Sequence, residues 1–420
     1  MKYLLFVLGC LLISSTVNCQ PLPGFNAEKV TRTLIDTIPA ASRIKANNYE
    51  EGGYWLLLWN FIYSLFIAWL FLYAGLSAYL KKISGKMENK NWGNFIYITL
   101  YFMIVYLVSF PLNLYQNFIR ERQYGLLNQG FVQWLLGDII NALILLIVCV
   151  PCFVLIYAVL KKVKENWVTL ATSLAVLCLV IYFTVYPVFI APLLTQHQSL
   201  KNAKLNEQIL SLARANGVKL DHVYVYNESG QSNRFNASVS GFAGSATIAI
   251  NDNFINNCTD QEIKAIVAHE IGHYVLNHMF ILTLEFGLVF FAGFKLVKWV
   301  FNRLQIKYGK RWQISSVDDI GGLPLLAILF TCYFFMVTPL SNTIIRTTEI
   351  EADNYGLNAA REPDAFINVM LKSAGNHKIE AGFWEESLFF DHPCRKNRIL
   401  AAMKWKAENL ATQKIINKNQ

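Results

Sequence analysis

Two histidines and one glutamate stand close together in the segment HEIGH, residues 269–273. On a helix, His269 and His273 project from one face about one turn apart, a spacing that suits two corners of a tetrahedral zinc site. Glu270 points to the neighbouring edge, where its carboxylate can take a proton from water at the metal and deliver it to a leaving amine. The spacing therefore predicts a hydrolytic centre that holds one zinc ion per chain, with Glu270 as general base.

A third metal ligand must come from elsewhere in the chain, because a catalytic zinc keeps one position open. The segment RTTEIEAD, residues 346–353, offers carboxylates. Glu349 and Asp353 share a helix face, so Glu349 can bind the metal while Asp353 accepts a hydrogen bond from a ligand histidine. Glu351 falls on the other side. The alternative interpretation is an ordinary acidic first turn, which the helix dipole favours.

The helix that carries HEIGH has a clear start signal. Thr259 and Glu262 form a capping box, in which Thr259 accepts from a backbone amide and Glu262 reaches back. Neither a proline nor a breaking pair follows, and we expect the helix to continue through His278. Because His278 is five residues after His273, it should face away from the metal and have a structural role or lie beside the substrate.

A small sheet is expected before this helix. Residues 200–216 have helical periodicity and end at Gly217, a natural cap. Three short strand candidates follow at 222–226, 236–240 and 246–250, with glycines supplying a turn between the second and the third. This part of the chain is therefore expected to be an α+β domain.

The composition indicates a membrane protein. The 420 residues are 54% apolar and only 15% charged, with 29 Phe, which is more apolar surface than one soluble core needs. Six apolar runs are each about as long as a bilayer-spanning helix requires, and they lack the alternation of barrel strands. The runs are 54–80, 95–112, 134–160, 167–190, 279–301 and 323–340. The predicted fold class is therefore mainly α, a multi-span helical bundle with a small metallopeptidase domain.

These runs divide the chain into five parts. Residues 1–19 are either a cleavable signal peptide or a first transmembrane helix, because the apolar run is short for a span. Four transmembrane helices are expected in 54–194 and two more in 279–345. The peptidase domain with the HEIGH helix occupies 195–278, and its C-terminal part, with the third ligand, occupies 346–420.

The net charge is +9, and the basic residues are unevenly spread, with lysine clusters that follow or precede several apolar runs. This pattern is typical of loops that contact anionic lipid headgroups, and membrane lipids are therefore expected partners rather than nucleic acid. The eight cysteines are scattered and do not suggest a disulfide framework.

Taken together, HEIGHYVLNH, the downstream pattern Glu349-x-x-Ala352-Asp353 and the membrane spans between them resemble the type I CaaX prenyl proteases and their bacterial relatives. These are integral-membrane zinc peptidases of the gluzincin kind. Residues 109–130, 190–193, 236–237 and the tail also align in order with features of that family. The resemblance covers most of the chain after about Trp55.

The resemblance implies roles for particular residues. His269, His273 and Glu349 would bind zinc, Glu270 would be the general base, and Asp353 would support a ligand from behind. In the tail, His392 and Arg398 match a motif that lies at the active site and steadies the substrate or the oxyanion.

A second match concerns the substrate. Asn236 and Ala237 resemble the end of the edge strand that holds an extended substrate by backbone pairing. Residues 227–235, however, lack the basic, histidine-containing stretch of close prenyl-protease relatives, and this departure leaves the substrate preference open.

Two classes of function remain. The first is an endopeptidase of membrane-associated or lipid-tailed polypeptides, either for CaaX processing or for membrane-protein quality control. Its location would be a bacterial inner membrane or, alternatively, the endoplasmic reticulum. The second is a non-hydrolytic transporter or channel with a structural zinc site. Glu270 discriminates between them, since a structural zinc site has no need of a general base.

Overall fold

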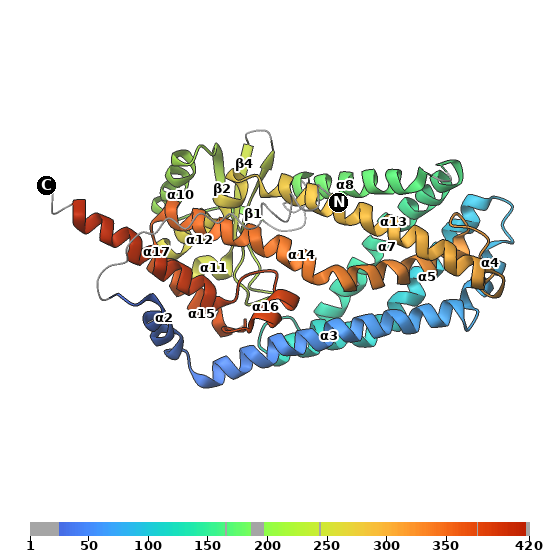
Figure 1. Ribbon diagram of the computed structural model, residues 1–420, viewed down its shortest axis with the longest axis horizontal. Coiled ribbons are helices and arrows are strands. Elements are labelled where there is room, and N and C mark those ends of the chain that lie inside the picture. Colours follow the sequence, from blue (N-terminus) through green and yellow to red (C-terminus); the bar gives the residue numbers. More distant parts are fainter. Residues whose placement is uncertain (1–24, 164–165, 186–196, 243–244, 376, 417–420) are drawn as a thin grey trace, which may run out of the picture.

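Long helices form one half of the elongated molecule, and a small sheet with shorter helices gathers at the other end (Figure 1). The computed structural model describes residues 25–416 except 164–165, 186–196, 243–244 and 376. The predicted signal peptide or helix at 1–19 and the matched segment 190–193 lie outside these residues. The end of the run 167–190 lies outside them as well.

Five helical segments of the described chain are long and apolar enough to cross a membrane, and a sixth apolar stretch, Trp167–Tyr182, is shorter. The helices that contribute are α3 (Ala40–Leu72), α5 (Lys90–Leu114), α7 (Phe131–Val163), α8 (Trp167–Val185), α13 (His278–Trp312) and α14 (Leu323–Ala360). Large apolar side chains such as Ile147 and Leu288 are more than 70% exposed. Such a surface suits contact with lipid tails, and the predicted mainly α membrane bundle agrees with it.

The first predicted span differs from the observed helix. The apolar run 54–80 does not form one helix, because α3 starts fourteen residues earlier and ends at Leu72. Gly75 then adopts a left-handed φ of +81°, which glycine tolerates best, and the chain continues in the short helix α4 (Leu76–Ser84). The apolar pattern continues across this turn, so hydropathy alone did not reveal it.

The predicted helix and strands of the soluble part are present with shifted ends. The helix is α10 (Ala203–Ala215), and Gly217 follows it with a φ of +74°. The strands are β2 (Leu220–Tyr226), β3 (Ala237–Phe242) and β4 (Ser245–Asn251), together with an unpredicted three-residue strand, β1 (His197–Ser199).

The strand order places β3 at an edge. The order is β1-β2-β4-β3, in which β2 and β4 are parallel and the two outer pairs are antiparallel. Ala237 pairs with Ile250 and Phe242 with Ser245. Buried side chains of the sheet, such as Ile248, pack with the HEIGH helix α12 (Asp260–Val275) in one hydrophobic core.

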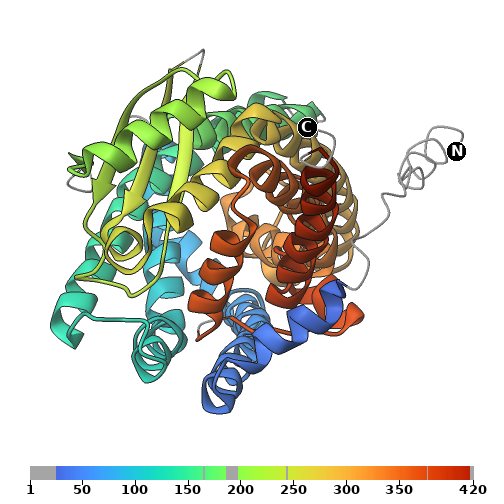
Figure 2. The same ribbon diagram turned by 90° about the vertical axis from the view of Figure 1, so that its left-hand side faces the viewer.

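Several short helices complete this end of the molecule: α2 (Ala27–Asp36), α11 (Asp252–Asn257), α15 (Pro363–Lys372), α16 (Phe383–Phe389) and α17 (Arg395–Ile416). Figure 2 shows the strands and α10 on one side and α15 to α17 on the other, with α2 beside them. A π-helical turn, Tyr115–Ile119, and α6 (Arg120–Gln123) extend α5, and 3-10 turns lie at Ile320–Gly322 and Ser373–Gly375. The active-site elements are thus enclosed from both sides.

The HEIGH helix ends earlier than predicted. The capping box of Thr259 and Glu262 is present as expected. The helix does not continue through His278, because α12 stops at Val275 and Asn277 adopts a left-handed φ of +56°. Asparagine is one of the few residues that tolerate this conformation. The chain therefore turns before α13 starts at His278.

Helix α14 is continuous from the membrane half into the peptidase half. Its 38 residues extend over about 57 Å at 1.5 Å per residue, well beyond the ~30 Å of a hydrocarbon core. No break occurs at the predicted boundary between 345 and 346. One rigid element therefore carries both a membrane span and the carboxylates of the site.

Candidate metal centre and active site

The three predicted metal ligands lie together. One ligand atom from each of His269, His273 and Glu349 falls within 4.8 Å of the others. The Nε2 atoms of the two histidines are 3.1 Å apart, and they lie 3.3 and 3.4 Å from the two carboxylate oxygens of Glu349. Ligands about 2.0 to 2.2 Å from one tetrahedral zinc ion are separated by roughly 3.3 to 3.5 Å. The triad therefore fits a zinc ion.

Two glycines allow the helices that carry the triad to approach each other. A Cβ atom on Gly272 would lie 3.1 Å from the Cβ of Tyr355, and one on Gly356 would lie 2.9 Å from the backbone nitrogen of His269. Larger residues would push α12 and α14 apart. The glycine of HEIGH thus has a packing role, and the close contact sets Glu349 against both histidines.

The electrostatics of the triad also favour a cation. His269 and Glu349 are 5% and 8% exposed, and the buried Oε2 of Glu349 has the imidazole nitrogens of His269 and His392 as neighbours, at 3.3 and 3.2 Å. Burial disfavours a charged imidazole, but Asp353 and Glu349 outweigh it and raise the pKa of His269 to about 10. A divalent cation satisfies the same carboxylates in place of that proton.

Asp353 lies where the spacing predicts it, behind the first histidine. Its Oδ1 is 2.8 Å from Nδ1 of His269, the nitrogen that faces away from Glu349. Arg398 donates to both oxygens of Asp353, at 2.7 and 2.5 Å, in a pair whose residues are 6% and 4% exposed. Arg398 lines the cavity of the site, but its guanidinium is committed to Asp353. Its placement indicates that it positions Asp353 and, through it, His269.

Glu270 faces the same cavity beside the triad. Burial raises the pKa of its carboxyl group above the usual value, while His269 and His273 oppose the shift. A carboxylate with a raised pKa accepts a proton more readily near neutral pH. The geometry thus places a general-base candidate next to the metal position.

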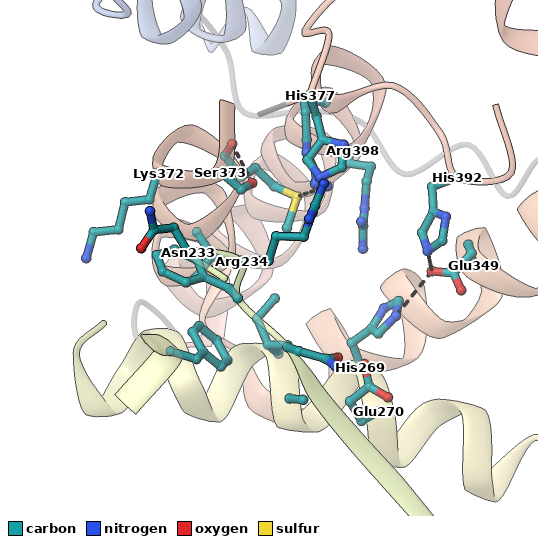
Figure 3. A pocket seen from close by; sticks show the side chains of 18 residues that line it. Asn233, Arg234, His269, Glu270, Glu349, Lys372, Ser373, His377, His392 and Arg398 are labelled. Atoms are coloured by element: carbon teal, nitrogen blue, oxygen red, sulfur yellow. Dashed lines mark hydrogen bonds and ion pairs between the residues drawn. The ribbon is translucent and has the colours of Figure 1, made fainter. Parts of the chain in front are cut away.

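His392 approaches the triad from the tail (Figure 3). Its Nε2 lies 3.2 Å from Oε2 of Glu349, and its Nδ1 lies 2.9 Å from Asp391. The segment before it is anchored on α14, because Arg346 donates to the backbone carbonyls of Glu386 and Phe390 at 2.9 and 2.6 Å. The imidazole is 48% exposed, so it can reach a bound molecule.

The predicted substrate contacts line the cavity as well. Asn236 and Ala237 stand at the start of the edge strand β3 and belong to the wall of the cavity. Among the described strands, β3 pairs only with β4. The preceding residues are a loop, which Arg234 ties to Glu121 at 2.6 Å and Asn128 ties to Ser229. The segment that departs from the family pattern is thus held against the membrane half.

His278 does not face away from the ligands, contrary to the prediction. Its Nδ1 lies 2.8 Å from Nδ1 of His273, and its Nε2 lies 3.1 Å from Glu351. The break at Asn277 turns the chain so that His278, only 1% exposed, packs behind the second ligand. Glu351 lies on the side of its helix away from Glu349, as the helical spacing predicts, and it is the last residue in the series of contacts from His273 through His278.

We therefore expect His278 to orient His273 and in this way to strengthen metal binding. Replacing it with phenylalanine should weaken zinc affinity about 10- to 100-fold, the usual cost of losing a group that orients a ligand. Competition with a chromophoric chelator on the purified protein measures this. A variant with unchanged zinc affinity would show that the contact is only packing.

Residues that spacing did not single out complete the cavity, whose volume is about 350 Å³. Arg234, Lys372, His377 and Arg395 all line it. Most of these four residues belong to segments in which the sequence shows no catalytic or metal-binding motif. Arg395 carries a signal that could have found it, because it is three residues before Arg398 and shares its helix face.

The chain matches two families that together cover most of its length. Residues 199–406 match Peptidase family M48, and residues 25–196 match the CAAX prenyl protease N-terminal family, which has five membrane helices. The fold is similar to the crystal structure of S. mikatae Ste24p, with a TM-score of 0.74 and 22% identity over 90% of this chain and 95% of that one. The predicted fold class is thereby confirmed.

Curated relatives belong to the same group of membrane metalloproteases. An uncharacterized metalloprotease of Bacillus subtilis, YhfN, is 29% identical over 81% of this chain and 80% of its own. CAAX prenyl protease 1 of Saccharomyces cerevisiae is 26% identical over 70% and 68%, and the human homologue is 21% identical over 85% of each chain. The protein is therefore an integral, multi-pass membrane metallopeptidase that belongs to the CAAX prenyl protease family and its bacterial relatives.

Proposed function

We propose that this protein is a zinc-dependent endopeptidase that cleaves membrane-associated or prenylated CaaX-type polypeptides. The observation that carries the proposal is the position of Glu270 beside the His269, His273 and Glu349 triad, in a cavity bordered by an edge strand. One zinc ion per chain would be held by these three ligands. When bound, zinc would polarise the scissile carbonyl and make water nucleophilic near neutral pH.

The residues of the chain supply the other steps. An extended substrate would pair with β3 near Asn236 and Ala237, which places its backbone across the cavity. Glu270 would accept a proton from the attacking water and pass it to the departing amine. His392, held by Asp391, would donate to the oxyanion that develops in the transition state.

The substrate class rests on two observations. Relatives named as CAAX prenyl proteases match over two thirds or more of this chain, and the helices beside the site are long enough to cross a membrane. The absence of a family-like basic stretch in 227–235 keeps unlipidated membrane proteins as the second substrate class. Glu270 argues against a channel with a structural zinc site, which does not need it.

The test combines zinc content with cleavage of two reporter peptides of one sequence, farnesylated and unlipidated, on purified protein in detergent. We expect about one zinc per chain and a higher kcat/KM for the farnesylated peptide, since a buried lipid chain adds binding energy. Equal rates would favour the quality-control substrates. A metal-free protein that cleaves neither peptide would remove the peptidase proposal in favour of the transporter or channel.

A further inference from the structure

Arg395, the first residue of α17, lines the catalytic cavity without a carboxylate partner. Its Nε atom is buried and meets no acceptor in the described part of the chain. Within the described residues, the hydrogen bond of its guanidinium is made by Nη1, which lies 3.3 Å from the sulfur of Met370. Thioether sulfur is a weak acceptor, so the guanidinium has no direct anionic partner in the described part of the chain.

The other cations on the cavity wall are already paired. Arg234 contacts Glu121 at 2.6 Å, Lys372 contacts Glu262 at 2.7 Å, and Arg398 is bound to Asp353. His377 lies 3.1 Å from Glu50. Among the described arginines and lysines of the wall, Arg395 alone lacks an ion pair.

Arg395 is partly exposed, but its Nε lies buried without an acceptor, and such a donor is costly and seldom kept without a use. Burial, together with the neighbouring Arg398, lowers the pKa of Arg395 to about 10, although the carboxylates of Asp353, Glu50 and Glu349 oppose the shift. Because Arg395 lines the cavity and is partly exposed, a carboxylate that enters the cavity could reach the guanidinium and supply the missing partner with two parallel hydrogen bonds.

The position of Arg395 relates it to the substrate path. It lines the catalytic cavity and also an adjoining cavity of about 250 Å³, and His392 and Arg398 line both. His392 lies 3.2 Å from Glu349 and lines both cavities, so the junction between them is next to the metal position. The carboxylates in the second cavity, Glu50 and Asp391, contact His377 and His392, and neither forms an ion pair with Arg395, although the charge of Glu50 acts on it from a distance.

We propose that Arg395 is a specificity-determining residue that binds a carboxylate of the substrate close to the scissile bond. The carboxylate is either the free C-terminus of the polypeptide or an acidic side chain. The inference rests on the proposed endopeptidase function and adds a chemical requirement to it. Bidentate recognition by arginine would favour substrates with such a group over neutral ones.

Four reporter peptides of one sequence separate the two sources. They carry a C-terminal acid or amide, combined with Glu or Gln on the C-terminal side of the scissile bond, and kcat and KM are measured for zinc-loaded wild type, Arg395→Gln and Arg395→Lys. We expect wild type to prefer one carboxylate about ten- to a hundredfold in kcat/KM, mainly through KM, as for one charged hydrogen-bonded pair. Arg395→Gln should abolish this ratio, and Arg395→Lys should retain part of it.

Lys396→Gln is the matched control, because Lys396 loses the same charge but contacts Glu380 outside the cavity. It should keep the wild-type ratio. Wild type that cleaves all four peptides equally, or Arg395→Gln with the wild-type ratio, would overturn the inference and leave the endopeptidase function standing. Failure of wild type to cleave any of the four would overturn both. Should Arg395→Gln not fold, the wild-type ratio and Arg395→Lys still decide.

Discussion

Replacing Glu270 with alanine is expected to reduce peptide cleavage about 10²- to 10⁴-fold while the protein keeps about one zinc per chain. The loss is this large because a positioned general base acts in the transition state, where its removal lowers kcat directly. The metal should stay, since the ligand atoms cluster in His269, His273 and Glu349 without Glu270. Zinc analysis and steady-state kinetics on the same preparation measure both quantities.

Glu270→Gln provides the control for this experiment. It preserves the volume of the side chain in the cavity and removes only the ability to accept a proton, so its activity should fall as far as that of Glu270→Ala. Persistent cleavage by both variants would contradict the assignment of Glu270 as base. Loss of zinc along with activity would instead indicate that Glu270 helps to hold the metal.

Removing the third ligand should have an even larger effect, because it removes the metal. In Glu349→Ala the site keeps only two of its three ligands, and we expect a zinc content near zero after dialysis, with cleavage below detection. A chelator should have the same effect on wild type, and added zinc should restore wild-type activity but not that of the variant. Metal analysis and cleavage before and after zinc addition make the comparison.

Glu351→Gln is the matched control on the same helix. Glu351 loses the same charge only two residues away, is about half exposed and contacts His278 rather than the triad. It should keep its zinc and change activity less than threefold. A zinc-loaded, active Glu349→Ala would show that the third ligand lies elsewhere, and metal loss in Glu351→Gln would show that its contact with His278 is needed to hold the metal.

Much of this site could be predicted because helical spacing is local. The four-residue intervals in HEIGH and between Glu349 and Asp353 place side chains on one helix face whatever surrounds them, and the structure has both pairs on such faces. The capping box of Thr259 is equally local. The membrane helices could be predicted for a similar reason, since a span needs a long apolar run in the sequence itself.

Errors arose where a single residue changes the chain direction. Asn277 and Gly75 adopt left-handed conformations that end helices inside patterns without a proline, and a periodicity analysis does not register them. The break at Asn277 had a chemical consequence, because it brought His278 from the predicted far side into contact with His273. Helix ends depend on packing around the turn, and the local sequence pattern does not predict that packing.

By itself, the sequence determined which groups could do the chemistry: two histidines and a carboxylate base on one helix, a second pair of carboxylates and a membrane-spanning frame. Only the tertiary structure decided how distant segments meet. It set Glu349 against the histidines through the close approach at Gly272 and Gly356, and it paired Arg398 with Asp353. It also left Arg395 unpaired in the cavity. Whether a charge is compensated depends on neighbours far away in the chain, so this property appears only when the elements pack.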